Sequence, residues 1–229
     1  MNINQLGIVR QTTTRADSKA VEKLGQCGVA TIHEVMGKAG LMKPYMRPVH
    51  PGMSVCGTAV TVLLQPGDNW MLHVAAEQVR EGDVVVAACT SECDDGFFGE
   101  LLATSFRARG AGGFIIEGGV RDVAALREMN FPTFSSAINA KGTYKTNPGS
   151  VNVPILCAGT VVHPGDAVVA DDDGVVIVPA DAAEEVAGLS RLREDREDDK
   201  RRRLAAGELN LDISDMREKL RQAGLRYVD

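Results

Sequence analysis

The apolar positions of residues 1–140 follow two periods that alternate along the chain. Short runs rich in valine, isoleucine and phenylalanine predict strands, and stretches with apolar residues three or four positions apart predict helices. The predicted strands are Ser54 to Leu64, Asp83 to Cys89, Gly113 to Ile116 and Phe134 to Ala137. The predicted helices are Ala16 to Gly25, Val29 to Lys38, Asn69 to Gln78, Leu101 to Arg109 and Val123 to Met129. This order predicts βαβ units around a parallel sheet.

The pattern changes after a predicted loop over residues 141–151. Short strands joined by glycine turns follow, which is typical of a β-meander. They are Val153 to Leu156, Thr160 to Val162, Ala167 to Asp171 and Val175 to Val178. Mixed charge at helical spacing then predicts a long helix, Asp181 to about Ala206, and a shorter one, Asn210 to Gly224.

These elements predict a single α/β domain over residues 1–179 and a helical extension for subunit contacts over residues 180–229. We expect α-β-β-α layers of the swivelling β/β/α kind in the domain. A helix that cannot bury much against its own domain is a candidate to reach a neighbouring subunit.

Composition narrows the class of protein. The chain has 229 residues, is 44 % hydrophobic and carries a net charge of −6, which argues against nucleic acid as a partner. Its five cysteines are odd in number and widely spaced, as expected for reduced thiols in a cytoplasmic protein. Neither an apolar run of the roughly 20 residues that span a membrane nor a signal-peptide core is present.

The stretch from Glu117 to Asp122 is the strongest candidate for chemistry. It follows an apolar run and contains Gly118 and Gly119, which predict a sharp turn between strand and helix. A divalent cation would bind the carboxylate of Asp122, and an anion would bind the guanidinium of Arg121. On spacing alone, an equally good interpretation is that Asp122 caps the helix and Arg121 pairs with a surface acid.

A second strand-to-helix turn covers residues 94–100. Backbone N–H groups at a helix start attract anions, so Leu101 and Leu102 could hold a carboxylate. Glu100 lies at this helix start, where it could transfer a proton or simply interact with the helix dipole. Because parallel βαβ units open on one edge of a sheet, we expect both turns to lie together.

The sequence Gly99-Glu100-Leu101-Leu102, followed by Gly118-Gly119-Val120-Arg121-Asp122, resembles a known family. It is similar to the class II pyruvate aldolases that act on 4-hydroxy-4-methyl-2-oxoglutarate and 4-carboxy-4-hydroxy-2-oxoadipate. These belong to the superfamily of the regulator of ribonuclease activity A. The resemblance covers nearly the whole chain, including the segments Thr31–Val35 and Gly67–Asn69 and the charged C-terminal helix.

The resemblance implies a retro-aldol lyase that needs a divalent metal, which is Mg²⁺, Mn²⁺ or Co²⁺. Such an enzyme yields pyruvate with oxaloacetate, or two pyruvates, in protocatechuate and gallate breakdown. Oxaloacetate decarboxylation is the expected side activity, because both reactions pass through the enolate of pyruvate. The resemblance also implies a homo-oligomer, either a trimer or a hexamer built as a dimer of trimers.

Residue roles follow from the same resemblance. Asp122 is the metal ligand, and Arg121 offsets the charge that develops on the keto oxygen. Glu100 moves the proton of the C4 hydroxyl through a water molecule, although many members carry Asp at this position. Asn69 and Lys145 approach the substrate's distal carboxylate or the metal's waters.

An acid from the C-terminal helix of the adjacent protomer completes the site in the aldolases that the chain resembles. We match Glu197 to that acid, and Glu194, about one helical turn earlier, is the alternative register.

Other interpretations remain open. Lys141 or Lys145 as a Schiff-base lysine would make the chain a class I aldolase. A non-catalytic inhibitor of an RNA-processing nuclease is the alternative from another class, and a methyltransferase using S-adenosylmethionine is weaker because no glycine-rich methyl-donor loop supports it. The aspartates at positions 171–173 suggest a calcium loop, but their spacing better fits a hairpin turn ending in Asp-Gly.

Overall fold

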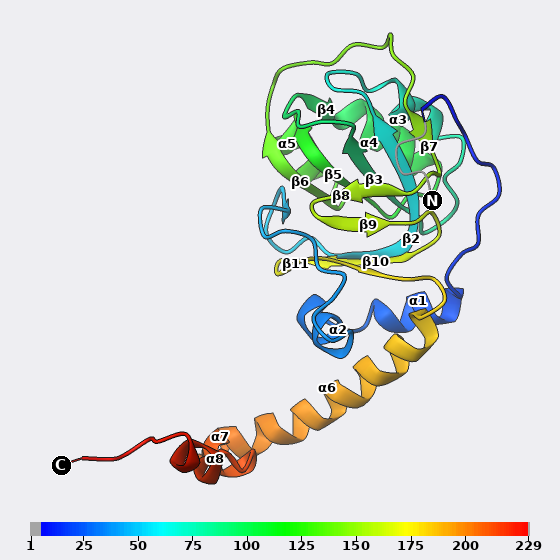
Figure 1. Cartoon of the computed structure of the whole chain (residues 1–229). Coiled ribbons are helices and arrows are strands. Elements are labelled where there is room, and N and C mark those ends of the chain that lie inside the picture. The colour runs from blue at the N-terminus through cyan, green and yellow to red at the C-terminus, as the bar shows by residue number, and fades with distance from the viewer. Residues whose placement is uncertain (1–5, 229) are drawn as a thin grey trace. The chain divides into compact units, whose positions relative to one another are not determined.

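The computed structural model describes residues 6–228 (Figure 1). Contacts within the chain divide it into two units, with the break between Ser190 and Arg191. The break falls inside the long helix α6 (Ala183–Ala205), so each unit is described by itself.

Four parallel strands form the centre of the first unit, as the βαβ pattern predicts. They are β2 (Val55–Leu64), β3 (Val84–Cys89), β5 (Gly113–Val120) and β6 (Thr133–Ile138). The helices between them are α3 (Trp70–Ala75), α4 (Glu100–Ala108) and α5 (Val123–Glu128). The strands pair β2 with β3, β3 with β5 and β5 with β6, so their carboxyl ends share one edge of the sheet.

Antiparallel strands extend this sheet until it nearly closes into a barrel. On one edge, β1 (Arg47–Pro48) pairs with β6. On the other, β10 (Ala167–Asp171) pairs with β2 and with β11 (Gly174–Val178). The segment before β1 reaches back to β11 through a bridge between Leu41 and Val176, which links the two edges.

The predicted meander is two separate hairpins. The strands β8 (Ile155–Cys157) and β9 (Thr160–Val162) form their own two-stranded sheet. The next strand, β10, pairs with β2 instead of continuing from β9, so the hairpin β10–β11 belongs to the main sheet. Two further short strands are β4 (Gly96–Phe98), which pairs with β5, and β7 (Ser150–Val151), which pairs with β2.

Strand alternation separates the core into layers. In β3, Val85 and Ala87 pack with α3, α4 and α5, whereas Val84 and Val86 face the interior of the nearly closed sheet. A third apolar layer joins the outer faces of β10 and β11 to α1 (Ser18–Leu24), α2 (Val29–Val35) and the start of α6. The mixed α/β architecture is therefore confirmed.

Two predicted helices differ from the observed ones for backbone reasons. The helix α2 ends at Val35, before the predicted Lys38, because Gly37 and Lys38 both adopt a φ of 66°. The predicted helix from Asn210 to Gly224 is two short helices, α7 (Asn210–Ile213) and α8 (Met216–Gln222). Between them Asp215 has a φ of 49°, which an α-helix does not accommodate.

The second unit buries none of its residues in the part that the structure describes, 191–228. Its surface carries several arginine–carboxylate pairs three to five positions apart, such as Arg203 with Glu208 and Arg217 with Asp212. Over residues 6–228, none of the helices is both long and apolar enough to cross a membrane.

Candidate active site

The predicted turn at Gly118 and Gly119 is wrong, because both glycines lie within a strand. Strand β5 continues through Gly118 and Gly119 to Val120. A Cβ on Gly119 would overlap the carbonyl oxygen of Asp94 and lie 2.6 Å from that of Asp95. Glycine is therefore needed for close approach of the segment before β4, and not for a turn.

The chain turns instead at Asp122, which has a φ of 56° and ψ of 36°. Its carboxylate does not cap its own helix, α5, which contradicts the capping interpretation. Asp122 Oδ2 accepts a hydrogen bond from the backbone N–H of Glu100 at 3.2 Å, at the start of α4. The two strand-to-helix turns thus meet, as expected, and Asp122 remains 46 % exposed.

Contact between Gly99 and Asp122 fixes this junction. A Cβ on Gly99 would overlap Asp122 Oδ2 and lie 3.1 Å from Arg121 Cγ. Only a residue without a side chain leaves the carboxylate at the helix start.

Arg121 is anchored through its backbone, since its N–H donates to Phe98 O at 2.8 Å. Its Nε lies 3.7 Å from Asp122 Oδ2, so the two charged groups adjoin. The side chain of Arg121 passes close to three glycines. A Cβ added to Gly96 would lie 3.4 Å from Arg121 Cβ, and one added to Gly99 would lie 3.1 Å from Arg121 Cγ. A Cβ added to Gly142 would lie 3.2 Å from Arg121 Nη1. We call this passage the glycine slot.

Glu100 is the first residue of α4, and its Oε1 accepts a hydrogen bond from Thr104 Oγ1 at 3.1 Å. The N–H groups of Leu101 and Leu102 belong to the first turn of this helix, where no helical acceptor exists for them. The start of α4, with the backbone N–H of Glu100 on Asp122 Oδ2, therefore lies beside Asp122 and its neighbour Arg121.

Asn69 lies on the same edge, after β2. Its Nδ2 donates to Phe97 O in β4 at 2.8 Å, which fixes the orientation of the amide. The other end of the amide, Oδ1, is buried and has no hydrogen-bond partner among the described residues. Such an oxygen is costly unless a ligand or water donates to it.

The loop that carries Lys145 is held against this edge by Asp68. Asp68 Oδ1 accepts from the N–H of Trp70, the first residue of α3, at 2.9 Å. Its Oδ2 accepts from the N–H groups of Thr146 at 2.6 Å and Asn147 at 2.8 Å. Burial alone would raise the pKa of Asp68, but these hydrogen bonds outweigh it and lower the pKa below its usual value. The pKa of His73 is lowered, first because the ring is partly buried and second because the positive charge of Lys145 lies nearby.

One pair at this edge was not predicted. Lys141 Nζ lies 2.9 Å from Asp95 Oδ1, next to the glycine slot. The sequence offered Lys141 only as a Schiff-base candidate, because nothing local links it to a carboxylate 46 positions earlier.

Glu197 and Glu194 lie in the second unit. Glu197 pairs with Arg193 along the helix at 2.9 Å. Their assignment to a neighbouring site stays a prediction.

The residues that could hold a metal are few. Within residues 6–228, no group of three or more histidine, cysteine, aspartate or glutamate side chains is arranged as a metal site. Asp122 offers one exposed carboxylate, which accepts a hydrogen bond from the backbone N–H of Glu100. This donor set fits Mg²⁺ or Mn²⁺, which bind through one or two carboxylates and complete their shell with water and substrate oxygens.

The aspartates at 171–173 serve the fold, and the predicted hairpin turn is confirmed. Asp171 Oδ2 accepts from the N–H of Val29 at 2.9 Å, and Asp172 Oδ1 accepts from that of Gly52 at 2.9 Å.

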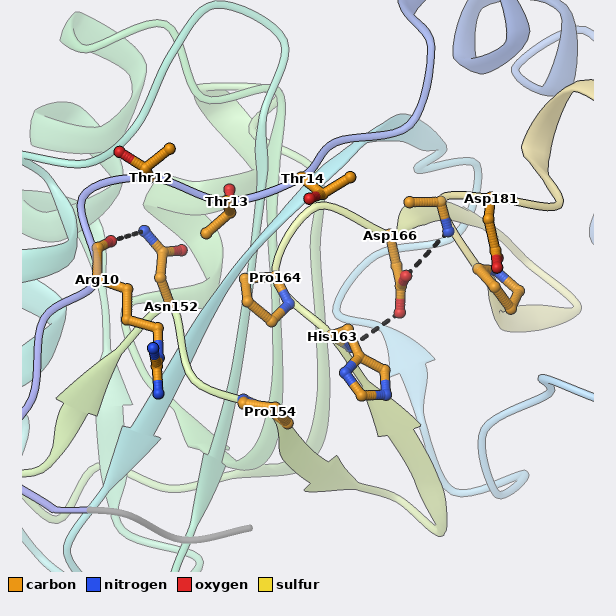
Figure 2. Close-up of a pocket in the computed structure, with 12 residues that line it drawn as sticks. Arg10, Thr12, Thr13, Thr14, Asn152, Pro154, His163, Pro164, Asp166 and Asp181 are labelled. Atoms are coloured by element: carbon orange, nitrogen blue, oxygen red, sulfur yellow. Dashed lines mark hydrogen bonds between the residues drawn. The ribbon is translucent and has the colours of Figure 1, made fainter. Parts of the chain in front are cut away.

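A cavity of about 790 Å³ lies elsewhere in the first unit, between residues 10–14 and the turn of His163 to Asp166 (Figure 2). Two backbone N–H groups, of His163 and Ala180, donate to the carboxylate of Asp166 there. None of the predicted site residues lines this cavity.

Comparisons with known proteins identify the family of the chain. The family model described as RraA-like, Aldolase/RraA, matches residues 29–177. A protein of Halalkalibacterium halodurans that carries the provisional name 4-hydroxy-4-methyl-2-oxoglutarate aldolase is 31 % identical over 175 residues, covering 76 % of this chain and 82 % of that protein.

Two solved structures share the fold. An uncharacterized protein of Pseudomonas syringae has a TM-score of 0.78 and 26 % identity, covering 89 % of this chain and all of that one. Streptomyces coelicolor RraAS2, described as an unusual member of the RNase ES inhibitor RraA family, has a TM-score of 0.73 and 28 % identity, covering 82 % of this chain and all of that one. The extent of the family match, with these relatives, shows that the chain belongs to the RraA-like (Aldolase/RraA) family.

Proposed function

We propose that this chain is a divalent-metal-dependent aldolase that releases pyruvate from 4-hydroxy-2-oxo acids. Its substrates are 4-carboxy-4-hydroxy-2-oxoadipate and 4-hydroxy-4-methyl-2-oxoglutarate. The observation that carries the proposal is the junction of Asp122, Arg121 and Glu100 at the start of α4. A carboxylate for a cation and a guanidinium for an oxyanion adjoin there. Glu100, whose backbone N–H donates to that carboxylate, brings an acid–base group to the same helix start.

Asp122 holds the metal, which is Mg²⁺ or Mn²⁺ and for which Co²⁺ can substitute. When bound, the cation supplies Lewis-acid stabilisation of negative charge on the keto oxygen. The N–H of Glu100 orients the carboxylate of Asp122 by donating to Oδ2.

Arg121 and the start of α4 bind the pyruvate half of the substrate. The N–H groups of Leu101 and Leu102 hold its 1-carboxylate, because a helix start presents donors without acceptors. Arg121 lies against the keto oxygen, where its charge offsets the negative charge of the developing enolate.

Glu100 takes the proton of the C4 hydroxyl through a water molecule. Its carboxylate is one methylene longer than the Asp of many family members, and the hydrogen bond from Thr104 Oγ1 restrains this longer side chain. The unpartnered Oδ1 of Asn69 accepts a hydrogen bond from the substrate or from a water that solvates it, and Lys145 attracts the distal carboxylate.

A second copy of the chain completes the site. Large apolar side chains at the same edge are exposed: Leu101 by 79 %, Tyr144 by 74 %, Ile138 by 66 % and Trp70 by 44 %. Exposed apolar residues around a polar site are typical of subunit contacts. In the trimer or hexamer that we propose, Glu197 of one copy reaches the site of another.

Borohydride trapping tests the class of aldolase. Reduction in the presence of pyruvate would attach pyruvate covalently to a Schiff-base lysine. We expect mass spectrometry to find no adduct on Lys141 or Lys145 in a preparation that turns over oxaloacetate. An adduct on either lysine would contradict the metal-dependent mechanism.

Inhibition of an RNA-processing nuclease is the second candidate, favoured by the similarity to RraAS2. It requires no chemistry from Glu100. A nuclease assay with the wild-type chain and with Glu100→Gln would show equal inhibition by both if this candidate were correct.

A further inference from the structure

The glycine slot has two walls. The segment before α4 supplies Gly96 and Gly99, and the segment after β6 supplies Gly142. Because Arg121 passes between them, the separation of the walls sets the position of its guanidinium.

Two hydrogen bonds join the walls. The N–H of Gly96 donates to Lys141 O at 2.7 Å, and Asn139 Nδ2 donates to Asp94 O at 2.8 Å. Within the second wall, the N–H of Lys141 donates to Asn139 Oδ1 at 2.9 Å. The ion pair of Lys141 with Asp95 adds a link between the side chains, one residue away from Gly142 and from Gly96.

The two partners of this ion pair differ in exposure. The side chain of Asp95 is 13 % exposed, whereas that of Lys141 is 68 % exposed. A largely buried carboxylate without a cation is unstable, so Asp95 holds Lys141 in place. The hydrogen bond to Asp95 raises the pKa of Lys141, which keeps its amine protonated and unsuited to forming a Schiff base.

We infer that the Lys141–Asp95 pair is a positioning element for Arg121, because it clamps the Gly142 wall of the glycine slot onto the Gly96 wall. The kinetic consequence of this inference rests on the proposed function, whereas the position of Arg121 can be tested without it. Lys141 acts through Gly142 and does not touch the reacting atoms.

Kinetics of the Lys141→Met variant test the clamp. Misplacing a group by about 1 Å can cost on the order of 10²-fold in rate, so we expect kcat for oxaloacetate decarboxylation to fall about 10- to 100-fold. KM should change by a smaller factor than kcat, because the charge that Arg121 offsets is largest in the transition state. Lys141→Arg should restore most of kcat, since arginine can also pair with Asp95.

Controls separate a clamp from a general loss of charge. Lys19→Met, at an exposed lysine of α1, should leave kcat unchanged. The double variant Lys141→Met with Asp95→Asn should be no slower than either single variant, because the pair acts as a unit. Unchanged kcat in Lys141→Met, or no rescue by arginine, would overturn the inference.

A crystal structure of Lys141→Met gives a reading that does not depend on turnover. We expect the guanidinium of Arg121 to leave its position beside Gly142. Arg121 unmoved in the variant would refute the clamp even if the wild-type chain were active. Arg121 displaced, with a wild-type chain that turns over neither substrate, would refute the proposed function and keep the clamp.

Discussion

At the scale of single residues, the exposed carboxylate of Asp122 can hold its place at the start of α4 because Gly99 has no side chain. Any Cβ on residue 99 would overlap Asp122 Oδ2, which is the atom that accepts the hydrogen bond from Glu100 N–H. The candidate metal ligand and the candidate anion-binding helix start are therefore fixed by one contact.

Substitution of Gly99 tests this contact. In Gly99→Ala the Cβ must displace the Asp122 carboxylate, so we expect Mn²⁺ affinity and turnover to fall at least about tenfold while the fold is kept. Titration with Mn²⁺ followed by electron paramagnetic resonance measures the affinity. The matched control is Gly188→Ala, because a Cβ at Gly188 in α6 meets nothing within 4 Å. Equal Mn²⁺ affinity in both variants would contradict the role of Gly99.

Arg121 is the residue whose substitution we expect to lower kcat the most. In Arg121→Ala the donor for the developing enolate is gone, and removing such a donor costs about 10²–10³ in kcat. Steady-state kinetics with oxaloacetate measure the loss. Arg109→Ala, at an exposed arginine of the same unit, is the control and should retain wild-type kcat. A loss below tenfold would remove Arg121 from its proposed role.

At the scale of elements, the sequence predicts most strands and the shared edge of the βαβ units. The continuous apolar runs at residues 84–89 in β3 and 113–116 in β5 are strong enough to place these strands without long-range information. Gly118 and Gly119 were misassigned because a glycine needed for close packing looks, in sequence, like a glycine needed for a turn. The glycine slot and the Lys141–Asp95 pair depend on which loops meet, and no local pattern carries that information.

The loop that carries Lys145 should depend on pH through Asp68. Since the folded chain lowers the pKa of Asp68, its ionised form stabilises the fold above the unfolded pKa of about 3.9. This stability is lost as pH falls through the lower, folded pKa. We expect Asp68→Asn to be less stable than wild type at pH 7, with the difference shrinking below about pH 4. Urea unfolding across pH 3–7 measures the difference in stability, and a difference independent of pH would contradict this role of Asp68.

At the scale of the whole molecule, the second unit cannot be stable from its own core. None of residues 191–228 is buried, and short helices without tertiary packing are marginal in water. We therefore expect this unit to pack in an oligomer, where Glu197 contributes to a neighbouring site.

Mixed oligomers test that exchange. Arg121→Ala and Glu197→Gln each remove one part of a site that spans two copies. After joint unfolding and reassembly, about one quarter of the sites would combine two intact parts, so about one quarter of wild-type activity should return. Replacing Glu197→Gln by Glu194→Gln checks the register. Mixtures as inactive as the single variants would place the whole site within one chain.

Metal dependence of the aldol cleavage is measured as pyruvate release from 4-carboxy-4-hydroxy-2-oxoadipate, coupled to lactate dehydrogenase, with Mg²⁺ and then with excess chelator. We expect turnover that vanishes with the chelator, returns when Mg²⁺ is restored, and is absent in Asp122→Asn under all conditions. Turnover that survives the chelator, or none with this substrate and none with oxaloacetate, would contradict the proposed function.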